Sequence, residues 1–178
     1  MNVKENVEDI DLVDEHFIED DEDTLQDNKY LTFKISDETY GVDIGDITEI
    51  IELQKITGIP DMPDHVKGVI NLRGKVIPVI DLRLRFHLED WKYDDRTCIV
   101  IAKVNETSVG FIVDRVLEVL DIPEANIDPP PQFKSKSGYE KYVMGIGKVG
   151  KDVKILIDVQ KVVHSEDMDR IKEIKQNY

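Results

Sequence analysis

The sequence predicts a mainly β protein made of two related small bodies, and an internal duplication is the main evidence. Residues 68–82 (GVINLRGKVIPVIDL) and 145–159 (GIGKVGKDVKILIDV) align without a gap. Each copy holds two β-branched runs around a polar break that contains glycine, a pattern typical of a hairpin. Upstream, residues 37–51 resemble residues 105–120, with one extra residue in the second copy. Two copies are too few for a solenoid, so we expect two compact β bodies.

Eight segments rich in β-branched and aromatic residues are predicted strands, four in each half. They span residues 29–35, 39–44, 66–72, 75–82, 97–104, 107–113, 142–149 and 153–159. Residues 46–53 and 115–122 combine helical spacing with β-branched composition, so each is either a helical turn or a short strand. Because a body of about 60 to 70 residues is marginal alone, we expect the two bodies to share an apolar interface.

The sequence pattern of the last segment, residues 164–178, predicts a C-terminal helix. Ser165 is a candidate N-cap, and Met168, Ile171 and Ile174 fall on one apolar edge.

Negative charge is concentrated at the N-terminus. Residues 1–27 hold twelve acidic residues and one lysine, a net charge of −11, whereas the whole chain has −15. Such a segment buries too little apolar surface to offset its ordering entropy, so we predict a disordered acidic leader. The acidic balance argues against nucleic-acid binding, which needs a basic face. The sequence has no apolar run long enough for a membrane span and no signal-peptide pattern.

No motif for catalysis or metal binding stands out. The four histidines occur in no metal-ligand spacing, and the single cysteine, Cys98, lies in an apolar strand and is interpreted as a buried hydrophobe. The chain contains no phosphate-binding glycine loop and no nucleophile elbow. This pattern favours a protein that works by binding. The element count fits SH3-like or OB-like barrels, which bind through surface grooves.

Residues 68–82, with the lead-in 59–67 and the segment 109–116, resemble the CheW family of chemotaxis coupling proteins. The similarity spans residues 28–163 and includes the spacings between motifs. It implies two five-stranded SH3-like barrels packed on a shared apolar core, with short helices and a C-terminal helix. It also implies that strands cross between the barrels, so that the barrels need not coincide with the duplicated regions near residues 37–82 and 105–159.

The resemblance further implies a scaffold without catalysis and without cofactors or metals. Such a protein couples the cytoplasmic tips of chemoreceptors to the regulatory domain of the histidine kinase CheA. It would be cytoplasmic and would reach membrane-associated arrays only through receptors. Two alternatives stay open at this point: an adaptor for a different two-component kinase, or a small enzyme of unknown chemistry.

Six residues are candidates for the receptor-binding surface. Glu49 and Arg73 are expected to form an ion pair, because their charges are opposite, the second copy has Gly150 where the first has Arg73, and the resemblance implies the same pairing. An exposed turn arginine and a separate surface glutamate are the competing interpretation. Ile44, Ile47, Val76 and Val116 are expected to line an apolar groove between the barrels, although core packing is the competing interpretation. The sequence assigns no kinase-binding residues.

We predict that the leader is dispensable for folding. A chain shortened to start at Asn28 is expected to keep its melting temperature within about 2 °C, well under 1 kcal/mol for a domain of this size. Thermal unfolding of the full and shortened chains measures this. A larger loss would mean that the leader packs on the barrels.

Overall fold

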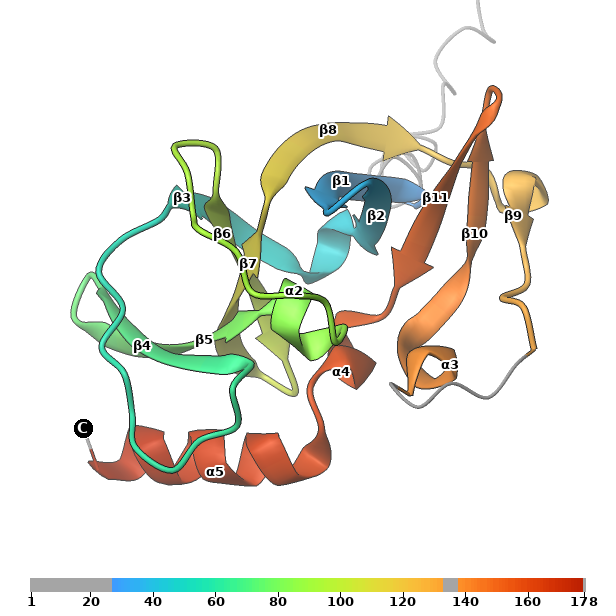
Figure 1. The fold of residues 1–178 in the computed structure, drawn as a ribbon. Helices are drawn as coiled ribbons and strands as arrows, with labels where there is room; N and C mark the ends of the chain where they lie inside the picture. The colour runs from blue at the N-terminus through green and yellow to red at the C-terminus, as the bar shows by residue number, and fades with distance from the viewer. Residues whose placement is uncertain (1–26, 133–137, 178) are drawn as a thin grey trace, which may run out of the picture.

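The computed structural model describes residues 27–132 and 138–177 (Figure 1). The predicted disorder of residues 1–27 therefore lies almost entirely outside the described residues. The elements in chain order are β1 Lys29–Ile35, β2 Glu38–Asp43, the 3-10 helix η1 Ile44–Asp46, β3 Ile47–Glu52, β4 Val66–Leu72, β5 Lys75–Asp81, α2 Leu82–Arg85, β6 Cys98–Val104, β7 Thr107–Val113, β8 Arg115–Asp121, the 3-10 helix η2 Glu124–Asn126, β9 Ile127–Asp128, α3 Tyr139–Tyr142, β10 Val143–Val149, β11 Asp152–Ile157, α4 Val159–Val162 and α5 Ser165–Asn177.

All eight predicted strands are present, with ends that differ by no more than two residues. The two ambiguous segments are resolved as strands. Ile47–Glu52 forms β3 and Arg115–Asp121 forms β8. Immediately before each of these strands, the chain passes from one sheet to the other. The β-branched residues therefore decided the structure of these segments, and the helical spacing did not. This adds a fifth long strand to each half.

The strands form two sheets that exchange parts of the two sequence halves. The six-stranded sheet has the order β8-β1-β2-β11-β10-β9, and the five-stranded sheet has the order β3-β6-β7-β5-β4. Strands β1 and β2 of the first half thus lie between β8 and β11 of the second, in the same sheet as β10 (Figure 1). The expected crossing of strands is confirmed. The sixth strand is the two-residue β9, which pairs with β10 beyond the five strands expected for that barrel.

The duplication is visible element by element. Strands β1 and β6 begin 69 residues apart, at Lys29 and Cys98, and β2 and β7 keep the same spacing. The turns Ser36–Asp37 and Asn105–Glu106 therefore correspond directly, and the extra residue expected in the second copy is wrong. Hairpin β10–β11 and helix α4 follow β4–β5 and α2 at a spacing of 77 residues.

Two glycines explain why each barrel tolerates a segment lying close against its hairpin. A Cβ atom on Gly68, whose φ is +140°, would lie 1.9 Å from the Thr57 carbonyl oxygen. At the duplicated position, a Cβ on Gly145 would lie 2.9 Å from the Asp128 carbonyl oxygen. Only glycine lets the backbones approach this closely. In each half, the linker that precedes the hairpin therefore adds a short bridge to it.

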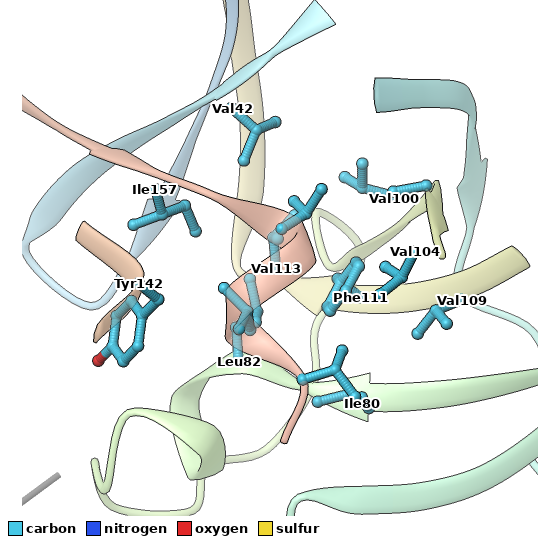
Figure 2. Packing of buried hydrophobic residues seen from close by; sticks show 14 of the residues in the cluster. Val42, Ile80, Leu82, Val100, Val104, Val109, Phe111, Val113, Tyr142 and Ile157 are labelled. Atoms are coloured by element: carbon cyan, nitrogen blue, oxygen red, sulfur yellow. The ribbon is translucent and has the colours of Figure 1, made fainter. Parts of the chain in front are cut away.

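One apolar cluster lies between the two sheets. The six-stranded sheet contributes side chains such as Phe33 and Val42, and the five-stranded sheet contributes others such as Val100 and Phe111. Figure 2 shows Val42 and Ile157 gathered with side chains of the other sheet and with Leu82 of α2. Two smaller clusters fill the barrels themselves. The expected interface between two marginal bodies is thus a single shared core.

Helix α5 packs on this body through the predicted apolar edge. Met168, Ile171 and Ile174 are all buried. The helix begins at Ser165, so Ser165 is the first helical residue. The prediction of Ser165 as the N-cap is therefore wrong by one residue. The imidazole of His65 lies 2.7 Å from the Asp167 carboxylate and ties the helix to the segment before β4.

Candidate interaction surface

Glu49 and Arg73 form the expected ion pair. Glu49 lies on β3, and Arg73 lies in the turn between β4 and β5, where its guanidinium donates a hydrogen bond to the Glu49 carboxylate. Strands β3 and β4 are the two ends of the five-stranded sheet, so the pair spans the closure of this barrel. The Arg73 side chain is 69% exposed, which leaves most of its guanidinium available to a partner.

The turn that carries Arg73 is shaped locally. Arg73 has a φ of +51° and is followed by Gly74 with a φ of +84°. The side-chain oxygen of Asn71 accepts a hydrogen bond from the Gly74 N–H at 2.8 Å. In the second copy, Gly150 stands at the position of Arg73. The duplication therefore presents an arginine at this turn position on one barrel only.

A groove of about 250 Å³ opens beside this ion pair. Its walls come from β3 to β7 and from the β4–β5 turn, and they mix apolar, hydroxyl and charged side chains. The lining residues are Thr48, Glu49, Leu72, Arg73, Lys75, Ile77, Ile101, Lys103 and Ser108. The groove is part of the same face as the ion pair.

The four predicted apolar residues are all partly exposed, but the structure does not bring them together as one set. Ile44, Ile47 and Val116 pack against the shared core from its border. Val76 instead lies on the β4–β5 hairpin, paired with Asn71, close in sequence to Arg73. The candidate residues thus form an apolar group at the crossovers and a hairpin group around the ion pair.

Two exposed apolar residues that were not among the sequence candidates extend the first group. Ile50 on β3 is 44% exposed and Val119 on β8 is 49% exposed. These residues occupy duplicated positions, and β3 and β8 are each the outermost strand of their sheets. Exposed apolar side chains on edge strands are usually covered by a partner. Their matching positions in the two copies were the signal available in the sequence.

A nearly buried ion pair holds one crossover in place. Arg83 of α2 binds Asp114, the residue between β7 and β8, with its Nε and Nη2 at 2.6 to 3.0 Å from the carboxylate oxygens. Asp114 also accepts a hydrogen bond from the Ser36 N–H at 2.6 Å. This bidentate contact raises the pKa of Arg83. One carboxylate therefore joins α2, the β1–β2 turn and the passage from one sheet to the other.

Sequence reasoning missed Arg83 and Asp114. Both lie next to apolar runs, where a single charged residue resembles an ordinary strand end. The arginine also stacks on Trp91, with its guanidinium carbon 4.0 Å from the ring centre. The available signal was the replacement of Arg83 by Gln160 in the second copy, which marks a difference in an otherwise matched position.

The described residues show no metal site and no membrane-spanning helix. In residues 27–132 and 138–177, no group of three or more histidine, cysteine or acidic side chains is arranged to hold a metal ion. No helix in the same part of the chain is long and apolar enough to cross a membrane. The positive features of the described surface are the Glu49–Arg73 ion pair and the exposed apolar residues of edge strands β3 and β8, which are typical of an interaction domain built from two barrels.

Comparisons with known proteins place this domain in a family. The model of the CheW-like domain matches residues 29–167. The chain is 35% identical to the chemotaxis protein CheW of Klebsiella aerogenes, over 84% of this chain and 90% of the relative. It is also 35% identical to CheW of Helicobacter pylori, over 83% and 87% of the two chains.

A solved structure agrees with these relatives. The crystal structure of the scaffolding protein TtCheW from Thermoanaerobacter tengcongensis superposes with a TM-score of 0.71 at 37% identity. The match covers 76% of this chain and 91% of that protein. The chain belongs to the CheW family, and its fold is the pair of SH3-like barrels that the resemblance implied.

The two ion pairs should contribute very differently to stability. Replacing Asp114 by alanine leaves the nearly buried Arg83 unpaired, so we expect a loss of about 3 to 5 kcal/mol. Replacing Glu49 by alanine breaks an exposed pair and should cost about 0 to 1 kcal/mol. Urea unfolding of both variants measures the difference. Equal losses would contradict the assignment of Asp114 as a structural residue and of Glu49 as a surface residue.

Proposed function

We propose that this protein is a non-enzymatic scaffold that couples transmembrane chemoreceptors to the histidine kinase CheA. Membership in a family of chemotaxis proteins supports the role, and the surface supports the mechanism. The observation that carries the proposal is the apolar side of edge strands β3 and β8, flanked on β3 by the Glu49–Arg73 pair. A protein of this kind works by holding partners in place and needs no cofactor.

The receptor-binding face is assigned to the six residues predicted from the sequence. Ile44, Ile47 and Val116 provide a partly exposed apolar border. Amphipathic helices bind by laying an apolar face into such a surface, and the tips of chemoreceptors are helical. Glu49, Arg73 and Val76 form the separate hairpin group, and in this proposal they would set the orientation of the bound helices.

The ion pair suits an orienting role better than an energetic one. An exposed pair adds little to stability, but it fixes a long side chain that otherwise moves freely. Glu49 restrains one side of the guanidinium and leaves the rest of this planar group to donate hydrogen bonds to a partner carboxylate or carbonyl. Loss of the restraint would weaken binding through both entropy and geometry.

The second partner is the regulatory domain of CheA, which shares this fold. No residues are assigned to kinase binding. This part of the proposal therefore names the partner and leaves the face that binds it open. The protein would act in the cytoplasm and would reach the membrane through the receptors. Bridging receptor and kinase in this way requires separate faces for the two partners.

The experiment compares the variants Arg73→Ala and Ile47→Ser with the unmodified chain in a reconstituted receptor–kinase array. Both variants are expected to lower receptor-fragment affinity by roughly threefold or more, because they remove an orienting group and an apolar contact. Arg170→Ala, which removes an exposed arginine of α5, is the control. Kinase activity and receptor pull-down are both measured.

Unchanged kinase activation by both variants, with correctly folded protein, would contradict the assigned face. Absence of any binding between the unmodified chain, the receptor fragment and the kinase domain would contradict the proposed function itself.

A further inference from the structure

The groove beside the Glu49–Arg73 pair carries more positive than negative charge, although the whole chain has a net charge of −15. Its cationic side chains are Arg73, Lys75 and Lys103. Among the described residues that line it, Glu49 is the single acidic one, and its carboxylate is already paired with Arg73. The charges of the two lysines are therefore not compensated within the lining.

The second barrel does not repeat this charge. The arginine and the lysine of the β4–β5 hairpin correspond to Gly150 and Asp152 at the spacing of 77 residues. Lys103 corresponds to Lys34 at the spacing of 69 residues. One lysine and one aspartate thus offset each other at the second set of positions, whereas the first set holds three cations. The positive groove is a difference between otherwise matched barrels.

Both lysine ammonium groups are available to a ligand. Lys75 and Lys103 are exposed, and within residues 27–132 and 138–177 neither ammonium takes part in an ion pair or a hydrogen bond. Lys103 is paired with Ser108 between β6 and β7, and β7 lies between β6 and β5 in the sheet. The Ser108 hydroxyl therefore enters the groove from the strand between the two that carry the lysines, and it can donate a further hydrogen bond to an anion.

The floor of the groove is apolar. Ile77 and Ile101 are buried, and Leu72 packs against the same cluster. The Thr48 hydroxyl donates to the Ile101 carbonyl at 3.1 Å, so its proton is already used. A ligand that fits this lining combines a short apolar stem with an anionic head, and this is the composition of a glutamate side chain.

We propose that this groove binds a glutamate side chain of the receptor helix, with the ammonium groups of Lys75 and Lys103 on its carboxylate. The buried isoleucines of the floor contact its methylene groups. This inference rests on the proposed function and names the chemistry that the groove selects in the partner. Charged contacts across an interface fix the register of a bound helix and speed its association. Because the second barrel has Asp152 at the position of Lys75, the acidic side chain also distinguishes one barrel from the other.

A small probe tests the groove without the receptor. Butyrate has the stem and the charge of a glutamate side chain, and butyramide is its neutral counterpart. In the full chain, butyrate should shift the methyl NMR signals of Ile77 and Ile101, whereas butyramide at equal concentration should not. The double variant Lys75→Met with Lys103→Met keeps apolar stems and removes both charges, so it should lose the response to butyrate.

Affinity for a soluble chemoreceptor cytoplasmic fragment tests the partner. In the double variant this affinity should fall about fivefold and should depend less on NaCl concentration, because two charges are lost from the interface. Lys151→Met removes an exposed lysine from the corresponding turn of the second barrel and should leave the affinity unchanged. Replacing the glutamates of the receptor tip by glutamine, one at a time, should identify one whose loss weakens binding to the full chain but not to the double variant.

The outcomes separate the inference from the function on which it rests. Equal responses to butyrate and butyramide, or a response to butyrate that survives in the double variant, would overturn the carboxylate site. Unchanged receptor affinity in a correctly folded double variant would overturn its assignment to the receptor. If the unmodified chain does not bind the receptor fragment, the proposed function fails, and the butyrate titration still decides whether the groove takes a carboxylate.

Discussion

The packing of apolar side chains between the two sheets holds the domain together, because neither sequence half completes a barrel from its own strands. Strands β1 and β2 lie in one sheet, and β3 to β5 of the same half lie in the other. Their inward faces meet in one cluster that also includes residues of α2, α4 and α5. Separating the barrels would expose this cluster and would leave both sheets without strands that they need.

This arrangement also places the candidate interaction surface. Each half must cross from one sheet to the other, and each crossing delivers an edge strand, β3 or β8. The border of the shared core therefore ends in partly exposed apolar residues at duplicated positions, such as Ile47 and Val116. A polar contact lies at one of these crossings, where the Asp114 carboxylate accepts a hydrogen bond from the Ser36 N–H of the β1–β2 turn. The residues that stabilise the fold and those assigned to binding are neighbours for this topological reason.

Arg85 shows how tightly this region is packed. Its guanidinium donates to the Val162 carbonyl at 2.6 Å and lies over the Tyr142 ring at 5.2 Å. Burial lowers the pKa of this arginine, and one of its nitrogens, Nη1, has no hydrogen-bond partner in the part of the chain that the structure describes. Burying a guanidinium nitrogen without a hydrogen-bond partner costs free energy, so the contacts of Arg85 around α2, α3 and α4 must offset this desolvation.

Much of the fold was readable from the sequence because the duplication repeats the same hydrophobic pattern. The paired glycines, the capping aspartates Asp81 and Asp158, and the β-branched runs all recur at a fixed spacing. The sequence did not decide whether the segments that form β3 and β8 are strands or helical turns, because their apolar residues fit a helix and an edge strand equally. The Arg83–Asp114 pair was also missed, since its partners are 31 residues apart and meet only after the strands cross. The Glu49–Arg73 pair was found because opposite charge, the difference between copies and the family resemblance agreed.

Unfolding of the full chain tests the shared core most directly. The fluorescence of Trp91, the single tryptophan, reports on the loop beside the five-stranded sheet, and NMR signals of β10 and β11 report on the six-stranded sheet. If one core holds both sheets, the two probes should lose their native signals in a single coincident transition as urea increases. Two separate transitions, with one sheet retaining native signals after the other has unfolded, would contradict this account.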